Sequence, residues 1–172
     1  MMNDDHYYMQ KALDLARQAA ACDEVPVGAV VVDSQGTIIG RGYNQVEEKK
    51  VQTAHAELAA ITEAAHLVGD WRLDGCSLYV TLEPCRMCMG LIQLSRLSRI
   101  LYAVESPRFG CQLDKEAISS VYKKDVYMKQ GICMEEAQRL LKQFFQQKRK
   151  EKDECTKARS NCYRKGVDTA EK

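Results

Sequence analysis

The interpretation of this chain of 172 residues depends on two short stretches, Thr53-Ala54-His55-Ala56-Glu57 and Thr81-Leu82-Glu83-Pro84-Cys85-Arg86-Met87-Cys88. The first contains a His-x-Glu pattern, and 30 residues after its histidine the second contains a Pro-Cys-x-x-Cys pattern. Each stands at the start of a segment with helical periodicity, 54–68 and 84–97. A predicted strand over 76–82 leads into the second segment. The histidine and the two cysteines are therefore expected at the starts of two helices.

The residue types in these stretches suit a zinc ion, which binds thiolate sulfur and imidazole nitrogen in tetrahedral geometry. Cys85 and Cys88 are three residues apart at a helix start, so their sulfurs share one face, where the helix dipole stabilises thiolates. With His55 they make three protein ligands, which leaves a fourth position for water, as in catalytic zinc sites. Glu57 is the candidate general acid and base beside that water.

A closed structural zinc site is the main alternative interpretation. It needs a fourth protein ligand, and the plausible donors inside the domain are Cys111, Cys133 and His66, none of which stands in a paired motif. A Cys-x-x-Cys or a His-x-Glu pattern alone has little specificity. Together, in this order, they form the signature of the zinc nucleoside deaminases. We therefore expect catalytic zinc, which lowers the pKa of its bound water to about 7.

The rest of the chain shows further helical and strand patterns around these two stretches. Further helices are predicted over 6–21 and from 135 to about 148, and further strands over 26–32, 37–40, 99–104 and, weakly, 125–128. Residues 43–53 and 105–120 are predicted to be loops, the second with some helix. A hairpin followed by alternating helices and strands predicts an α/β fold, a three-layer α/β/α sandwich with helices on both faces of a mixed sheet.

Composition and charge are typical of one globular domain, with 45% hydrophobic and 28% charged residues and a net charge of +1. The charge is uneven: residues 148–172 hold nine basic and five acidic side chains, and the preceding part holds 16 and 19. Because apolar residues thin out beyond 150, we predict a domain over 1–150 and a polar tail over 151–172 that is disordered or a frayed helix. A polyanionic partner must then meet local basic groups, and the candidates are Arg72, Arg108 and the run Lys148-Arg149-Lys150.

No stretch approaches the roughly 18 apolar residues of a membrane span, and the first ten residues lack the pattern of a signal peptide. We therefore expect a cytoplasmic protein with no membrane contact, in which paired cysteines bind metal and do not form disulfides. The other cysteines of the domain are predicted to be small buried or half-buried thiols: Cys22, Cys76, Cys111 and Cys133.

From about residue 8 to 150 the chain resembles the bacterial tRNA-specific adenosine deaminases, within the cytidine and deoxycytidylate deaminase superfamily. Beyond the zinc motif, the resemblance lies in flanking segments, which favour the tRNA branch over deaminases of free cytidine or guanine: Glu24 to Val30, Gly42-x-Asn44, Trp71-Arg72-Leu73, Tyr79 to Cys85, Met87-Cys88 and Phe144-Phe145. It implies a hydrolase of tRNA processing that converts the wobble adenosine of an anticodon to inosine with one zinc ion per subunit.

The resemblance also implies a cytidine-deaminase-like fold with a five-stranded sheet, and a homodimer with composite active sites that binds a tRNA anticodon stem-loop. It implies that Asn44 hydrogen-bonds the flipped adenine, that Ala56 lends a backbone group near the reacting carbon, and that Val25 and Pro26 line the base pocket. Ordinary structural roles remain open, since asparagine often ends a strand and valine often belongs to a core.

The chain departs from the family pattern around the site. Val51-Gln52 replaces Asp-Pro before the histidine motif, Met89-Gly90-Leu91 replaces Ala-Gly-Ala after the cysteines, and the loop from Glu105 to Cys111 replaces an Asp followed by a Lys-x-Gly-Ala stretch. That last loop helps to hold RNA in the family, which makes Glu105 a candidate substrate contact. Phe145 is a second one, available either to the core or to neighbouring bases. These departures leave the zinc chemistry untouched and bear on RNA contacts and the dimer surface.

Two other functions stay open at this point. One is a deaminase of free cytosine or guanine compounds, which would share the same zinc motif. The other is a non-catalytic zinc-binding partner subunit, which would be expected to lack the acid–base glutamate. Glu57 is present in this chain, which favours an enzyme.

Overall fold

The computed structural model describes residues 4–111 and 126–167, with side chains over 5–111 and 126–156. Its elements in chain order are α1 (Asp4–Ala21), β1 (Gly28–Val32), β2 (Ile38–Tyr43), α2 (Val46–Lys49), α3 (Ala56–Val68), β3 (Ser77–Leu82), α4 (Arg86–Leu94), β4 (Arg99–Val104), β5 (Tyr127–Gln130) and α6 (Met134–Val167).

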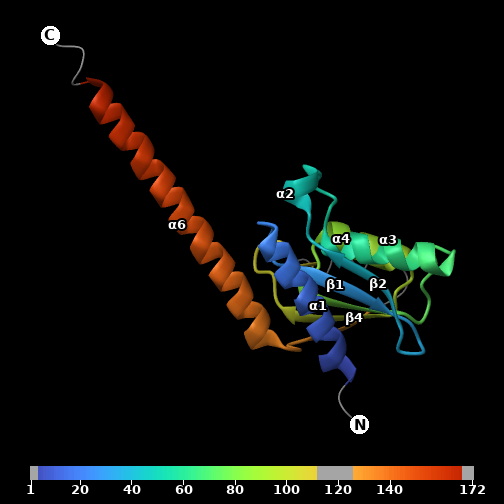
Figure 1. The fold of residues 1–172 in the computed structure, drawn as a ribbon. Helices are drawn as coiled ribbons and strands as arrows, with labels where there is room; N and C mark the ends of the chain where they lie inside the picture. The colour runs from blue at the N-terminus through green and yellow to red at the C-terminus, as the bar shows by residue number, and fades with distance from the viewer. Residues whose placement is uncertain (1–3, 112–125, 168–172) are drawn as a thin grey trace.

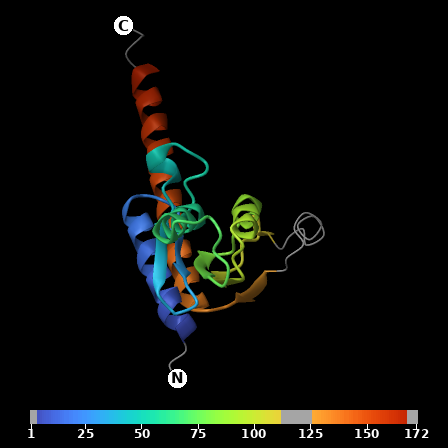
Figure 2. The same ribbon diagram turned by 90° about the vertical axis from the view of Figure 1, so that its right-hand side faces the viewer.

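The five strands form one mixed sheet in the order β2-β1-β3-β4-β5. Strand β1 pairs antiparallel with β2 and β3, whereas β3, β4 and β5 run parallel to one another. Helices α3 and α4 lie on one face, and α1 and the beginning of α6 lie on the other (Figures 1 and 2). The predicted three-layer sandwich around a five-stranded mixed sheet is confirmed.

The apolar runs of the central strands are explained by burial on both faces of the sheet. In β1, Ala29 and Val31 join the core under α3 and α4, while Val30 and Val32 join the core under α1. Successive side chains of a strand point to opposite faces, so an unbroken Val-Val-Val run supplies both cores. The middle of the sheet is thereby fixed between two helix layers.

Strand β2 lies unusually close to α3, and two glycines make this possible. A Cβ atom added at Gly42 would lie 2.2 Å from the carbonyl oxygen of Ala56, and one at Gly40 would lie 2.1 Å from that of Ala60. Alternate residues of a strand share a face, so Asn44 continues the face on which Gly40 and Gly42 meet α3. The beginning of α3, with the preceding residue His55 and with Glu57 in its first turn, therefore lies against the end of β2.

We expect Gly42→Ala to destabilise the protein by about 3 kcal/mol or more, because the added methyl group overlaps backbone rather than a flexible side chain. Thermal or urea unfolding measures the change. Gly90→Ala in α4 is the matched control, since a Cβ there meets nothing within 4 Å and alanine favours a helix by about 1 kcal/mol. Equal unfolding midpoints for the two variants would contradict the contact between β2 and α3.

The structure differs from the sequence-based boundaries near the site. Strand β2 continues to Tyr43, three residues beyond its predicted end, and the short helix α2 interrupts the segment predicted as a loop. Strand β5 begins two residues later than predicted. Of the predicted loop over 105–120, residues 112–120 lie outside the described residues.

Helix α6 runs to Val167, well past the predicted helix end near residue 148, and projects away from the body (Figures 1 and 2). The predicted division of the chain at residue 150 stays a prediction. Ile132, just before this helix, and Ala137, in its first turn, attach its beginning to the core on this side. Among the helices described, none is both long and apolar enough to cross a membrane.

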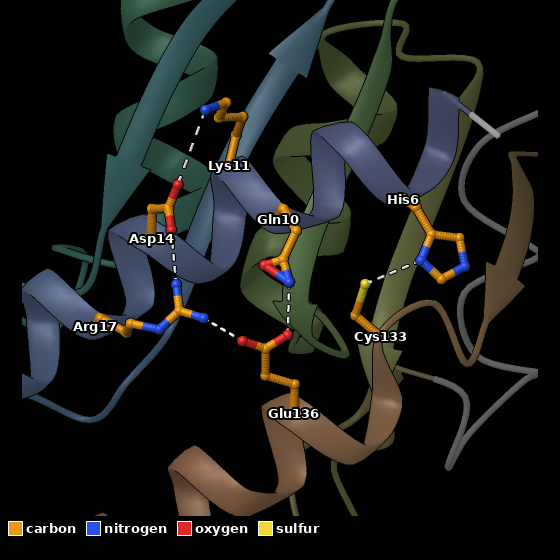
Figure 3. Close-up of polar contacts among 7 residues, drawn as sticks. All are labelled: His6, Gln10, Lys11, Asp14, Arg17, Cys133 and Glu136. Carbon is orange, nitrogen blue, oxygen red and sulfur yellow. Dashed lines mark hydrogen bonds and ion pairs between the residues drawn. The ribbon is translucent and has the colours of Figure 1, made fainter. Parts of the chain in front are cut away.

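A polar cluster fastens the beginning of α6 to α1 (Figure 3). The carboxylate of Glu136 accepts hydrogen bonds from Gln10, at 2.5 Å, and from the guanidinium of Arg17, which also donates to Asp14 at 2.6 Å. Beside this cluster, the Cys133 sulfur lies 3.4 Å from Nδ1 of His6. Charged pairs on an exposed surface contribute little individually, so this network orients α6 more than it stabilises the fold.

Candidate active site

The predicted ligands His55, Cys85 and Cys88 come together between the starts of α3 and α4. Nδ1 of His55 lies 3.4 Å from Sγ of Cys88 and 3.8 Å from Sγ of Cys85, and the two sulfurs are 3.5 Å apart. Within the described part of the chain, these three residues form the one group of three or more potential metal ligands.

The separations fit a tetrahedral zinc ion. Zn–S bonds of about 2.3 Å and Zn–N bonds of about 2.0–2.1 Å place neighbouring ligand atoms of a tetrahedron roughly 3.5–3.8 Å apart. Two thiolates and one imidazole are also the donor types that zinc prefers. The residues present therefore fit zinc and leave one coordination position for a non-protein ligand.

Local backbone structure places two of the ligands just before their helices. His55 and Cys85 are the N-cap residues of α3 and α4, with extended φ/ψ of −80°/152° and −74°/171°. This corrects the predicted helix starts at 54 and 84, because a residue must leave the helical conformation to present its side chain across the helix end. The loop after β4 is held against Cys85, since Cys111 N–H donates to the Pro84 carbonyl at 3.0 Å.

Hydrogen bonds join the two thiols and the imidazole to one another. A hydrogen bond with Cys88 and a second one with His55 lower the pKa of Cys85 to about 4. The same hydrogen bond and burial raise the pKa of Cys88, and the bond with Cys85 raises that of His55. A bound cation would displace these protons, which is how metal sites of this donor type load.

Glu57 lies beside the cluster in the first turn of α3 and is only 4% exposed. Burial raises the pKa of its carboxyl group, and a hydrogen bond with Cys88 acts in the opposite direction. A glutamate whose pKa is moved toward neutrality can both accept and return a proton near pH 7. The arrangement therefore supplies an acid–base group next to an open three-ligand metal site.

The donors that a closed structural site would need are engaged elsewhere or exposed. The sulfur of Cys111 is buried and lies 3.7 Å from the carboxylate of Glu83, and Cys133 contacts His6 on the other face of the sheet. His66 lies in the last turn of α3, at the opposite end from the cluster. Cys22 is exposed, so its prediction as a buried or half-buried thiol is wrong.

Residues predicted to contact the substrate fall into two groups. Asn44 and Ala56 are buried, and Ala56 is the first residue of α3, where backbone N–H groups have no partner within the helix. Pro26 is buried and Val25 half-buried, in the segment that leads into β1. Asn44 N–H donates to the Val27 carbonyl at 3.0 Å, so this segment borders the end of β2.

Glu105 and Phe145 lie apart from that group. Glu105 is exposed in the loop after β4. Phe145 is 43% exposed on α6, on the α1 side of the sheet, and its ring meets that of Phe144 edge to face. The structure therefore keeps both residues outside the metal cluster, and Phe145 is not a core residue.

A groove of about 600 Å³ opens beside His55, between α3 and the segment that contains α2. It is lined by Gln45, Lys49, Val51, Thr53, Ala54, His55, Leu58, Ala59, Thr62, Glu63 and His66. Most of these side chains can donate or accept a hydrogen bond. The groove thus places side chains that can hydrogen-bond, among apolar ones, along the surface beside His55.

Two buried glutamates near the site are absent from the sequence-based predictions. Glu24 is 0% exposed and accepts a hydrogen bond from Nδ2 of Asn44 at 3.0 Å. Glu83 is 6% exposed and accepts from the backbone N–H of Ser106 at 2.9 Å. Their positions directly before Val-Pro and Pro-Cys were the available signals, but neither pattern indicates burial.

Comparison with known proteins shows which protein family the chain resembles. A model of the cytidine and deoxycytidylate deaminase zinc-binding region matches residues 2–104. The tRNA-specific adenosine deaminase of Bacillus subtilis (strain 168) is 39% identical over 153 residues, covering 88% of this chain and 94% of that protein. A solved structure from a study of A-to-I editing by tRNA:A34 deaminases at the wobble position of transfer RNA has 37% identity and a TM-score of 0.73, over 78% of this chain and 99% of that one.

A structure of guanine deaminase from Bacillus subtilis is also 37% identical, with a TM-score of 0.55 over 61% of this chain and 66% of that one. The family match spans more than half of the chain and includes His55, Cys85 and Cys88. The chain therefore belongs to the cytidine and deoxycytidylate deaminase family and contains its zinc-binding region.

Proposed function

We propose that this protein is a zinc-dependent hydrolase that deaminates the wobble adenosine of a tRNA anticodon to inosine. The observation that carries the proposal is the convergence of His55, Cys85 and Cys88 beside the buried carboxyl group of Glu57. The tRNA-specific adenosine deaminase of Bacillus subtilis is 39% identical over 88% of this chain, whereas the guanine deaminase of Nitrosomonas europaea matches 81% of the chain at 25% identity. The relatives therefore support the substrate class, and the site supports the reaction type.

The reaction needs a water molecule activated at the target carbon. His55, Cys85 and Cys88 would hold a zinc ion, which would supply that activation by lowering the pKa of its bound water to about 7. Glu57 takes the water proton and donates it to N1 of the adenine ring. It later moves the proton of the new C6 hydroxyl to the amino group, which leaves as ammonia while the C6 carbonyl forms. Its buried position keeps bulk water from competing for these transfers.

The target base is flipped out of the anticodon loop into the space bordered by Val25, Pro26 and the end of β2. The Asn44 side chain hydrogen-bonds the base there, and the backbone N–H of Ala56 lies near the reacting carbon. These roles are supported by the burial of Asn44 and Ala56, and by the hydrogen bond from Gln45 N–H to the Ala54 carbonyl, which joins the neighbours of Asn44 and His55. Recognition of an unstacked loop base is the usual way in which proteins read RNA sequence.

Neighbouring nucleotides require surfaces outside the base pocket. The groove beside His55 offers polar side chains along α3, and the exposed Phe145 ring offers a face for stacking. Glu105 and Arg108 lie exposed in the loop after β4, next to the segment that holds Cys85. We extend the proposal to a cytoplasmic homodimer, in which a partner subunit completes the RNA-binding surface.

The basic run at 148–150 is one candidate contact with RNA phosphates. Arg149 and Lys150 are exposed, whereas Lys148 pairs with Asp23 at the end of α1 and with Glu151. Truncation after Gln147 should raise KM for a stem-loop several-fold and make it less salt-dependent, with kcat unchanged, because phosphate contacts release counterions.

Steady-state kinetics at several salt concentrations measure both effects. Lys148→Ala is the matched control, since it removes the link to Asp23 and keeps the two exposed cations. If the truncated protein binds RNA as the full chain does, residues after 147 take no part. If Lys148→Ala raises KM equally, the orientation of α6 is responsible and not its charge.

One assay separates the proposed function from its rivals. The zinc-loaded protein is incubated with an anticodon stem-loop that has adenosine at the wobble position, and separately with guanine and cytidine. We expect inosine from the stem-loop and negligible turnover of the small substrates. Rapid guanine turnover with an inert stem-loop would favour the alternative suggested by the guanine deaminase structure. Zinc binding without any turnover would indicate a non-catalytic subunit, despite the presence of Glu57.

A further inference from the structure

Glu24 is a carboxylate in an unexpected place. It follows the left-handed residue Asp23 at the end of α1 (φ 64°) and is completely buried. Burying a carboxylate is costly unless its oxygens accept hydrogen bonds. Both oxygens do so: Oε2 accepts from Nδ2 of Asn44 at 3.0 Å, and Oε1 accepts from the backbone N–H of Glu48 at 2.7 Å. Both donors belong to the segment between β2 and the metal ligand His55.

The backbone around Asn44 is fixed independently of Glu24. Its own N–H donates to the Val27 carbonyl at 3.0 Å, and the next N–H, of Gln45, donates to the Ala54 carbonyl at 2.9 Å. Ala54 directly precedes His55. With the backbone held by these two bonds, only the orientation of the Asn44 side chain remains to be set. Glu24 contacts the amide group of that side chain.

In this contact Asn44 can only be the hydrogen-bond donor and Glu24 only the acceptor. A carboxylate oxygen only accepts, so the amide nitrogen of Asn44 must face Glu24 and its carbonyl oxygen must face away. Without such a partner, the two ends of an asparagine amide differ little in shape, and either can face a ligand. Glu24 therefore determines which end of the amide is presented on the other side.

We infer that Glu24 is a positioning residue for base recognition, because its buried carboxylate holds the Asn44 amide with Oδ1 and the second N–H free for the target adenine. The same carboxylate holds the N–H of Glu48 and so anchors α2, which borders the groove beside His55. The inference rests on the proposed function, in which Asn44 contacts the flipped base. Glu24 itself touches no substrate in this arrangement.

Glu24→Gln tests the orientation without removing volume. The N–H of Glu48 only donates, so the introduced glutamine must turn its carbonyl oxygen toward Glu48 and its amide nitrogen toward Asn44. Asn44 must then turn its own oxygen toward position 24, which reverses the end that it presents to the base. All hydrogen bonds are kept, and we expect unchanged zinc content and melting temperature with kcat/KM on the stem-loop reduced roughly tenfold to hundredfold.

Asn44→Asp and the double variant Glu24→Gln/Asn44→Asp separate positioning from stability. The single change puts two carboxylates in contact and should lower the melting temperature. The double change restores the contact with reversed polarity, since the introduced glutamine amide donates to the introduced aspartate carboxylate. We expect the double variant to regain thermal stability and zinc but not activity, because the introduced aspartate has no N–H to donate to the base.

Three results would overturn the inference. They are full kcat/KM in Glu24→Gln, a fall in its activity that only follows a fall in zinc content or melting temperature, and recovery of activity in the double variant. A fourth check uses Asn44→Ala: adding Glu24→Gln should cost nothing more if Glu24 acts through Asn44, and an undiminished loss would contradict it. If the wild-type protein deaminates guanine and not the stem-loop, the proposed function fails while the same variants, assayed on guanine, still test Glu24.

Discussion

Glu57→Gln is expected to reduce deamination of an anticodon stem-loop by about 10³-fold or more while leaving zinc bound. Positioned acid–base groups contribute roughly 10²–10⁴-fold, and here a single carboxyl group serves several proton transfers in one turnover. Glutamine has nearly the same size and keeps hydrogen-bonding capacity in a site that is 4% exposed, but it cannot accept the water proton. Single-turnover rates and zinc content by mass spectrometry are the measurements.

The control for Glu57 is Glu135→Gln on the exposed first turn of α6. This change removes the same charge far from the metal cluster, and turnover should stay within about twofold of wild type, as for most surface substitutions. Zinc content and the unfolding midpoint of Glu57→Gln should match wild type too. Retention of full deamination by Glu57→Gln would remove this residue from the mechanism and leave the metal cluster without an acid–base partner.

Cys85→Ala is expected to abolish both stoichiometric zinc and measurable turnover. The cluster has three protein ligands, and removing one leaves a two-ligand site that cannot hold zinc against dilution. Because zinc binds the folded protein in preference to the unfolded chain, its loss also lowers the unfolding midpoint. A chelator should lower the midpoint of the wild-type protein and leave that of Cys85→Ala unchanged.

Cys111→Ala is the matched control, because Cys111 is a buried thiol whose backbone N–H bonds the carbonyl of Pro84, the residue before Cys85. Its sulfur lies 3.7 Å from Glu83, and it is not among the three clustered ligands. We expect this variant to keep zinc and most of its activity, with a stability loss of about 1–2 kcal/mol for the smaller side chain. Zinc loss equal to that of Cys85→Ala would make Cys111 a fourth ligand and the site structural.

The metal cluster could be predicted because its chemistry depends on residue types at fixed spacing. His55, Cys85 and Cys88 stand at the ends of helices whose apolar periodicity is visible in the sequence. The strands beneath them were identifiable for a related reason, since burial on both faces demands uninterrupted β-branched residues such as those of β1. Periodicity does not distinguish an N-cap from a first turn, so the helix starts were misplaced by two residues.

Glu24 could not be predicted, because its burial depends on donors that are distant in the sequence. Its partners, Asn44 and the N–H of Glu48, follow it by 20 or more residues, and no local pattern links them. The end of α6 was missed for the opposite reason. Its apolar pattern stops near Phe145, while lysine, glutamate, glutamine and arginine have enough intrinsic helix propensity to continue the helix.

The close approach of β2 to α3 has a consequence for the motions of the site. With hydrogen atoms in place of side chains at Gly40 and Gly42, the strand and the helix touch through their backbones, and there is no flexible side chain between them to absorb relative displacement. The His55 imidazole, the Glu57 carboxyl group and the Asn44 amide are all carried by this closely packed pair of elements or by the residues next to them. We therefore expect thermal fluctuations to displace these three groups together, so that little reorganisation would be needed when a base binds.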